Sequence, residues 1–212
     1  MLYWRCTLER LRENPRPRRE TCGKVKGEYM KSTEKNPLAV IKTRLGDITM
    51  ELYPDQAPNA VGAFIWVAKQ GLFDHRKICR VVPGFVIQPS YTDFEDERCK
   101  LILNGEYESN GVHNATPFRA GTVAMGGEGA IASGSCFFIT LTDEAGKKLD
   151  GKFAAFGAVT GGWDVVEKIA ALPLTPVEND LGVEINEPAQ RLDMDCVQVE
   201  TWGNDYPFER LQ

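Results

Sequence analysis

The stretch ICRVVPGFVIQPS (residues 78–90) places one arginine, Arg80, inside an apolar run that reverses at Pro-Gly and resumes as Phe-Val-Ile before Gln88. The run predicts two short strands, over 78–82 and 84–88, joined by a tight turn. A guanidinium stays charged at every accessible pH, so its burial without a partner is very costly. Arg80 must therefore pair with a carboxylate, reach the surface, or face a site where a ligand supplies hydrogen-bond acceptors.

The sequence on either side of this stretch predicts a mainly β domain. Partial alternation of apolar residues predicts a hairpin over 37–55. Apolar residues at helical spacing, with Pro58 in the first turn and Gly71 at the end, predict a helix over 55–71. Several short strands with only two helices favour a closed antiparallel barrel over a doubly wound sheet. The remaining predicted elements are strands over 121–125, 135–142, 153–158 and 191–202 and a helix over 163–171.

The composition fits one domain without a membrane span. The chain has 212 residues, 42% of them hydrophobic, which is enough for one substantial core. No apolar run is long enough to cross a bilayer, and the N-terminus lacks the apolar core of a secretory signal. The six cysteines include no CxxC pair, which predicts reduced thiols in a cytoplasmic protein. With two histidines and no Cys/His cluster, we expect neither a zinc site nor a cofactor.

Charge divides the chain into a basic tail and an acidic body. Residues 1–36 carry ten Lys and Arg against five Asp and Glu, and the remainder carries fifteen against twenty-five. The acidic body argues against a nucleic-acid binder, and the composition of the tail predicts disorder. Lys-Gly-Glu-Tyr before Met30 would be encoded by a purine-rich stretch similar to a bacterial ribosome-binding site. We therefore hypothesise that Met30 is the true start and that residues 1–29 are a translated leader.

Motifs for several common chemistries are missing or out of context. Gly127-x-Gly129-x-x-Ala132 formally matches a dinucleotide-binding fingerprint, but it runs into the β-rich CFFITL instead of a helix, so we reject it. The chain has no GxSxG, Walker A or EF-hand pattern, and its two histidines speak against a serine triad. Any chemistry must therefore run without an activated nucleophile, a metal or a phosphate cradle.

Several blocks of the chain resemble, in order and approximate spacing, the cyclophilin peptidyl-prolyl isomerases. The resemblance covers residues 37–203, leaves 204–212 as a C-terminal tail, and implies an eight-stranded antiparallel barrel capped by two α-helices. NGEYESNGVHN (104–114) is most similar to bacterial members. The blocks are AVIKTRLGDITMELYPDQAPNAVGAFIWVAKQG (39–71), RVVPGFVIQ (80–88), FRAGTVAMG (118–126), GSCFFIT (134–140), LDGKFAAFGAV (149–159) and GWDVVEKI (162–169).

The reaction that this resemblance implies gives Arg80 a physical role. Rotation about an Xaa-Pro bond loses amide resonance across a barrier of about 20 kcal/mol and needs no covalent change. The prolyl nitrogen gains a lone pair in the twisted state, so a fixed cationic donor stabilises that state more than the planar one. By resemblance, Arg80 is the catalytic donor, and Gln88 orients it or a substrate carbonyl. The resemblance also implies a substrate-binding set, in which Phe85, Met125, Phe138 and Leu149 line a proline pocket and Phe153, Cys79, Cys136, Gly126 and Gly127 complete the site.

The candidate site departs from the family at several positions. Cys79 and Phe153 stand where histidines are common, and Cys136 stands where a glutamine is usual. Gly126-Gly127-Glu128 replaces a small polar segment that binds substrate backbone. These changes predict weaker ground-state binding and reduced turnover. Lys148 falls near the position of a tryptophan that contacts cyclosporin, which predicts weak cyclosporin binding.

Three functions remain open at this point. The first is an active bacterial, cytoplasmic isomerase, expected to be a monomer, that acts on proline-containing polypeptides and assists folding without a nucleic-acid or membrane partner. The second is a non-catalytic proline-peptide binding module or chaperone on the same fold. The third is an interaction domain without prolyl function, in which the candidate side chains would not converge. A separate hypothesis concerns Cys79, which is either a reactive thiol activated by Arg80 or an inert buried one.

Overall fold

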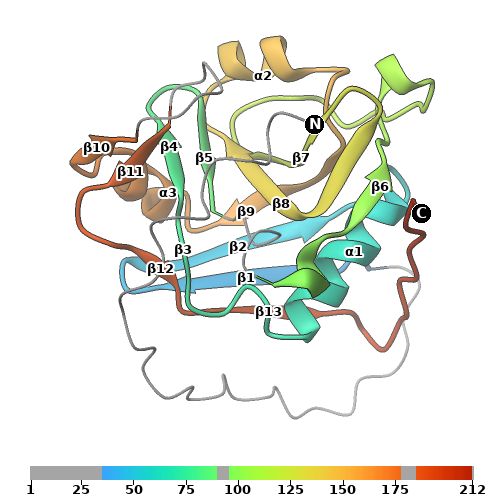
Figure 1. Cartoon of the computed structure of the whole chain (residues 1–212), viewed down its shortest axis with the longest axis horizontal. Helices are drawn as coiled ribbons and strands as arrows, with labels where there is room; N and C mark the ends of the chain where they lie inside the picture. The colour runs from blue at the N-terminus through green and yellow to red at the C-terminus, as the bar shows by residue number, and fades with distance from the viewer. Residues whose placement is uncertain (1–34, 90–95, 178–184, 212) are drawn as a thin grey trace.

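Nine strands form one antiparallel sheet that curls around the core of the protein (Figure 1). They are β1 (Leu38–Thr43), β2 (Gly46–Leu52), β4 (Arg80–Val82), β5 (Val86–Gln88), β6 (Ile102–Asn104), β7 (Thr122–Glu128), β8 (Ile131–Thr140), β9 (Ala155–Gly161) and β13 (Cys196–Glu200). Their order is β13–β1–β2–β9–β7–β8–β5–β4, and β6 pairs with β8 off this path. The structure is a computed structural model that describes residues 35–89, 96–177 and 185–211.

The prediction of a closed barrel is wrong, because the sheet is open between β4 and β13, the two ends of its path. Two short strands that precede these ends, β3 (Arg76–Lys77) and β12 (Asp193–Met194), form a separate ladder instead. On β13, the Val197 N–H donates to Asp74 Oδ1 at 3.2 Å. A further hairpin, of β10 (Leu174–Pro176) and β11 (Asn186–Pro188), packs beside β4.

The described residues form three α-helices beside the sheet, one more than the sequence predicted. The predicted helices are confirmed as α1 (Pro58–Lys69) and α3 (Trp163–Ala170). The additional helix, α2 (Asp143–Leu149), lies at the top of Figure 1 and contacts β8. Thr142 caps it by accepting the Ala145 N–H at 3.1 Å. Short 3₁₀ turns, η2 (Glu97–Cys99) and η3 (Glu108–Asn110), lie in the segment between β5 and β7.

Helix α1 closes one side of the main core with an aromatic cluster. The Phe64 ring lies 5.2 Å from Phe73, 5.2 Å from Phe137 of β8 and 5.4 Å from Phe156 of β9, measured between ring centroids. All four rings are fully buried. Tilted and edge-to-face contacts of this kind add to the free energy of apolar burial, so these residues join the helix to the sheet.

The N-terminus of α1 is capped by a residue that is distant in sequence. Ala57 at the N-cap has no side-chain acceptor, and Pro58 has no N–H. The N–H groups of Asn59 and Ala60 donate to Glu106 Oε1 and Oε2, each at 2.9 Å. One carboxylate therefore accepts the two N–H groups of the first turn that have no acceptor within the helix, where the helix dipole also favours negative charge.

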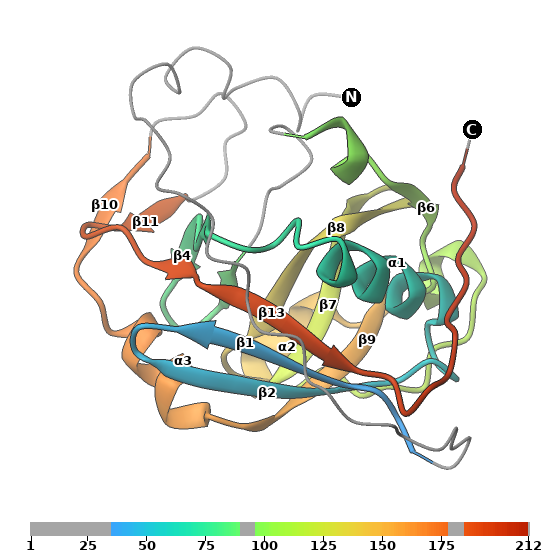
Figure 2. The same ribbon diagram turned by 90° about the horizontal axis from the view of Figure 1, so that it is seen from below.

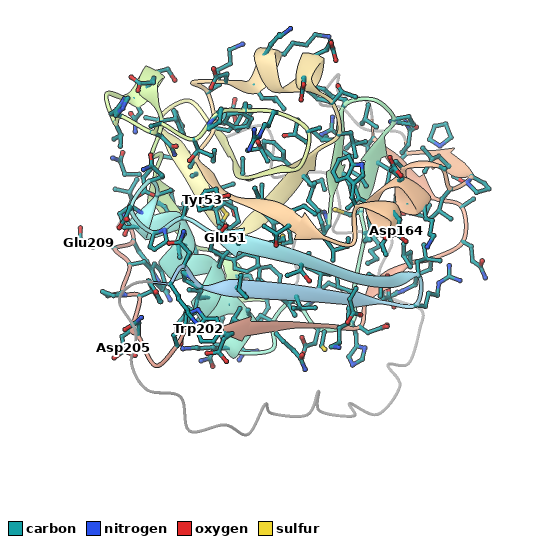
Figure 3. The ribbon with its side chains drawn as sticks, turned by 180° about the vertical axis from the view of Figure 1, so that it is seen from behind. Glu51, Tyr53, Asp164, Trp202, Asp205 and Glu209 are labelled. Carbon is teal, nitrogen blue, oxygen red and sulfur yellow. The ribbon has the colours of Figure 1, made fainter. Side chains whose placement is uncertain are left out.

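The C-terminal segment 204–211 runs along α1 (Figure 2). The Glu209 N–H donates to Asn59 Oδ1 at 2.8 Å, and the Phe208 ring lies 6.1 Å from the Trp66 ring. A Cβ on Gly62 would lie 2.7 Å from the Pro207 carbonyl oxygen, so only glycine permits this approach. Figure 3 shows the edge that the segment follows, with Trp202, Asp205 and Glu209 labelled.

Several sequence predictions concern parts of the chain that the structure leaves undescribed. The basic tail lies outside the described residues except for Lys35 and Asn36, and the proposed start at Met30 lies wholly outside them. In the described parts of the chain, no helix is both long enough and apolar enough to cross a membrane. Among the described cysteines, Cys79, Cys99 and Cys136 are free thiols, as predicted, and Cys6 and Cys22 lie outside the described residues.

Candidate active site

Side chains of β4, β5 and β8 alternate between a face that points into the main core and a face that points away from it. Val81 of β4, Ile87 of β5 and Phe137 of β8 belong to the main core. Successive side chains in a strand point to opposite faces, so the neighbours of these residues point away from that core. The residues on this outer face are Arg80 of β4, Val86 and Gln88 of β5, and Cys136 and Phe138 of β8.

Arg80 and Gln88 face one another across the β4–β5 pair. The two residues are register partners, and Arg80 Nη1 donates to Gln88 Oε1 at 3.3 Å. Gln88 is 6% exposed, whereas Arg80 is half-buried, so the guanidinium lies at the rim of the protein and the amide lies beneath it. At least one N–H group of Arg80 therefore has an amide acceptor within the protein.

An apolar cluster, which we call the outer-face cluster, lies on the same side of the sheet. Its buried members are Val86, Ala124, Phe138 and Leu149, and Phe85, Phe118 and Phe153 pack against them, partly buried. The Phe138 and Phe153 rings meet edge to face at 5.3 Å. Continuing the β5–β8 register by one residue from the Ile87–Ile139 pair sets Gln88 level with Phe138. The guanidinium–amide pair thus borders the apolar cluster.

Most of the predicted substrate-binding residues meet in this region, but Met125 does not. Phe85, Phe138, Leu149 and Phe153 all belong to the outer-face cluster, although they come from three separate parts of the chain. Met125 is fully buried in the main core on the inner face. The structure therefore places the Met125 side chain away from the cluster, and its neighbour Ala124 occupies the outer face of β7.

Sequence reasoning missed three members of the cluster, which are Val86, Ala124 and Phe118. Side-chain alternation could have predicted the first two. Val86 lies two residues before Gln88 and Ala124 two residues before Gly126, so each shares a strand face with a predicted site residue. Phe118 lies before β7 in an irregular segment, where no periodicity applies. Its position follows from packing, because a Cβ on Gly146 of α2 would lie 2.4 Å from the Phe118 carbonyl oxygen.

The two predicted glycines lie where β7 and β8 change register. The pairing shifts between Met125 and Gly127, and Gly126 is buried while Gly127 is exposed. A Cβ on Gly126 would lie 2.9 Å from Cys136 Sγ, and one on Gly127 would lie 2.3 Å from the Ile131 carbonyl oxygen. Neither position has room for a side chain. Local packing therefore requires glycine at both positions, whether or not they contact a ligand.

Both cysteines of the candidate site are buried thiols that contact Gln88. Cys79 Sγ donates to the Gln88 carbonyl oxygen at 3.1 Å, and Gln88 Nε2 donates to Cys136 Sγ at 2.9 Å. Burial, and secondarily the nearby Cys136, raises the pKa of Cys79 well above its usual value. Burial and this raised pKa favour an inert buried thiol over a thiol activated by Arg80.

In the described residues, no group of three or more His, Cys, Asp or Glu side chains could hold a metal ion. The region instead offers a partly exposed guanidinium, a buried amide that accepts from it, and an apolar cluster with three half-buried aromatic rings. Such a combination can bind an apolar ring and direct N–H donors at atoms attached to that ring.

Comparison with known proteins identifies the family. Residues 38–190 match the model of the family described as "Cyclophilin type peptidyl-prolyl cis-trans isomerase/CLD". The chain belongs to this family. A peptidyl-prolyl cis-trans isomerase from Rhizopus delemar is 38% identical over 131 residues, which are 62% of this chain and 20% of that protein. The chain thus spans about a fifth of the length of this relative.

Other cyclophilin relatives are closer to this chain in length. A peptidyl-prolyl cis-trans isomerase from Acinetobacter baylyi is 31% identical over 172 residues, covering 78% of this chain and 87% of that protein. A crystal structure of a Cryptosporidium parvum cyclophilin type isomerase, determined in the presence of the dipeptide Ala-Pro, has a TM-score of 0.63. It is 19% identical, and the match covers 77% of this chain and 98% of that one, so it supports the fold alone.

Proposed function

We propose that this protein accelerates cis-trans rotation about Xaa-Pro bonds in polypeptides, with Arg80 as the catalytic donor. The observation that carries the proposal is the position of Arg80, bonded to Gln88 at the border of the outer-face cluster. A prolyl ring seated on Phe138 and Leu149 would have its nitrogen within the region that the guanidinium can reach. Membership of the cyclophilin family supports the same reaction.

The chemistry needs no group beyond these side chains. As the Xaa-Pro bond twists, the prolyl nitrogen becomes pyramidal and its lone pair can accept an N–H from Arg80. The guanidinium is always charged and presents several donors in a rigid fork, so it can also hold the preceding carbonyl oxygen. The apolar cluster binds the ring in both the planar and the twisted state, and only the arginine distinguishes them, as catalysis requires.

Substrates, location and assembly extend the proposal. We propose proline-containing polypeptides as substrates, Phe85, Phe138, Leu149 and Phe153 as their apolar contacts, and a domain over residues 37–203. A cytoplasmic location, a bacterial source and a monomeric state stay predictions, since the curated relatives include fungal and bacterial proteins.

The test is exchange NMR on short Xaa-Pro peptides, which reads the rotation rate without a coupled protease. We expect the wild type to accelerate exchange and Arg80→Ala to lose the acceleration by a factor on the order of 10². Arg44→Ala is the matched control, because Arg44 is exposed and bonds the Arg191 carbonyl oxygen far from the cluster. Peptide binding at Phe138 without acceleration would refute catalysis and establish the non-catalytic module instead.

A further inference from the structure

The Gln88 side chain is held at both ends of its amide. Its Oε1 accepts from Arg80 Nη1 at 3.3 Å, and its Nε2 donates to Cys136 Sγ at 2.9 Å. Its backbone carbonyl also accepts from Cys79 Sγ at 3.1 Å. Gln88 is 6% exposed and Cys136 is 4% exposed, so the bonds from Gln88 to the two cysteines are formed in the interior, where the low dielectric strengthens a hydrogen bond, whereas the bond to Arg80 is partly buried.

The chemistry of these partners permits one orientation of the amide. A guanidinium has only donors, so the side of Gln88 that faces Arg80 must be its oxygen. The NH₂ group then points to Cys136, whose sulfur can act as an acceptor. A rotated amide would set its NH₂ against the guanidinium and lose both bonds. Arg80 and Cys136 therefore select the same orientation from opposite ends.

The position of the sulfur is itself fixed by the backbone. Gly126 packs against Cys136 so closely that a Cβ there would lie 2.9 Å from Sγ. Cys136 also receives a backbone constraint, because its N–H donates to Ser133 Oγ at 3.2 Å. Strands β7 and β8 of the main sheet therefore fix the position of the Cys136 sulfur, which accepts a hydrogen bond from Gln88.

We infer that Cys136 is a positioning residue that acts on Arg80 through the Gln88 amide. The inference rests on the proposed function, since it concerns the arginine of that same site. Without the sulfur acceptor, the Gln88 amide can rotate, and its Oε1 no longer holds the guanidinium at one point. Arg80 then spends less time in the position from which it stabilises the twisted bond, while the apolar cluster that binds the peptide is unchanged.

The experiment compares Cys136→Ala, which removes the acceptor, with Cys136→Ser, which supplies a hydroxyl oxygen in its place. Exchange NMR at saturating peptide should show a rotation rate about five-fold lower for Cys136→Ala, the effect of one lost hydrogen bond. The peptide dissociation constant should stay within about two-fold of wild type, and Cys136→Ser should recover most of the rate. Cys99→Ala is the matched control, because Cys99 is a buried thiol of the main core.

A second readout does not depend on activity. The side-chain NH₂ resonances of Gln88, identified by their absence in Gln88→Glu, should move in Cys136→Ala and stay in place in Cys99→Ala. Wild-type rates and unmoved resonances in Cys136→Ala would overturn the inference, as would a Cys136→Ser rate as low as that of the alanine variant. If the wild type itself showed no acceleration, the proposed function would fall, and the resonances alone would decide whether Cys136 holds Gln88.

Discussion

Replacing Glu106 by alanine should destabilise the protein more than any other exchange of a single carboxylate discussed above. The change leaves the N–H groups of Asn59 and Ala60 without their acceptor, at a helix start where Ala57 and Pro58 offer no substitute. An unsatisfied buried donor costs about 1 to 3 kcal/mol. Burial of the carboxylate is itself unfavourable, and alanine removes that cost, so we expect a loss of about 2 to 3 kcal/mol in the free energy of unfolding.

Equilibrium unfolding in urea at pH 7 measures this loss. For a domain of this size a loss of that order shifts the midpoint by roughly 1 M. Glu108→Ala is the control, since Glu108 lies two residues away from Glu106 and is exposed. Among the ion pairs of the described residues, Glu108 pairs only with His113, which is also exposed. A Glu106→Ala midpoint equal to that of the control would refute the assignment of Glu106 as the cap of α1.

The same carboxylate gives a pH dependence of known sign. Burial raises the pKa of Glu106, and the N–H bonds from Asn59 and Ala60 oppose that shift only in part. An acid whose folded pKa exceeds its unfolded pKa stabilises the fold fully below the unfolded value and loses that contribution as the pH rises through the folded value. The unfolding free energy of wild type relative to Glu106→Gln should therefore decrease as the pH rises from about 4. A rising difference would mean that the folded pKa of Glu106 lies below its unfolded value, and it would contradict the dominance of burial over the two N–H bonds.

Three further predictions concern the candidate site. Gly126→Ala should slow rotation several-fold, because its Cβ would displace the Cys136 sulfur that holds Gln88; an unchanged rate in exchange NMR would contradict the close packing of Gly126 on Cys136. Cys79 should react with a thiol reagent as slowly as the fully buried Cys99 in the native protein, because burial raises its pKa; rapid, selective labelling of Cys79 would oppose this. Cyclosporin should bind weakly, because Lys148 is an exposed residue of α2 that offers no indole, and titration calorimetry showing tight binding would refute the expectation.

Local sequence patterns predicted the strands and helices better than they predicted whether the sheet closes into a barrel. The hairpin of β1 and β2 and the helix α1 follow from alternation and from helical spacing, and both are present. Helix α2 has only seven residues and too few apolar positions to show a period, so no local signal announced it. The opening between β4 and β13 depends on pairs such as Asp193 with Lys77, which are far apart in sequence and have no local signature.

The candidate site was predictable where a residue type has few alternative uses. An arginine within the apolar run of β4 required an acceptor, and Gln88 supplies one. Met125 was assigned by order along the chain without regard to the face of β7, and alternation places it in the core instead. Glu106 and its role at α1 were not foreseen, because the residue lies 46 positions from the N–H of Ala60 to which it bonds.

The place of Arg80 at the end of the sheet has a consequence for how the protein responds to heat. Within the described residues, β4 is the last strand of the path and pairs with β5 at three positions. Segments held by few contacts open at a lower free energy than the whole domain. If this three-residue pairing opens before the rest of the sheet on warming, Arg80 leaves its place beside Gln88 while β1, β2, β9 and β13 still retain their structure. Circular dichroism, which follows the bulk of the sheet, would overstate the temperature range over which the protein can work.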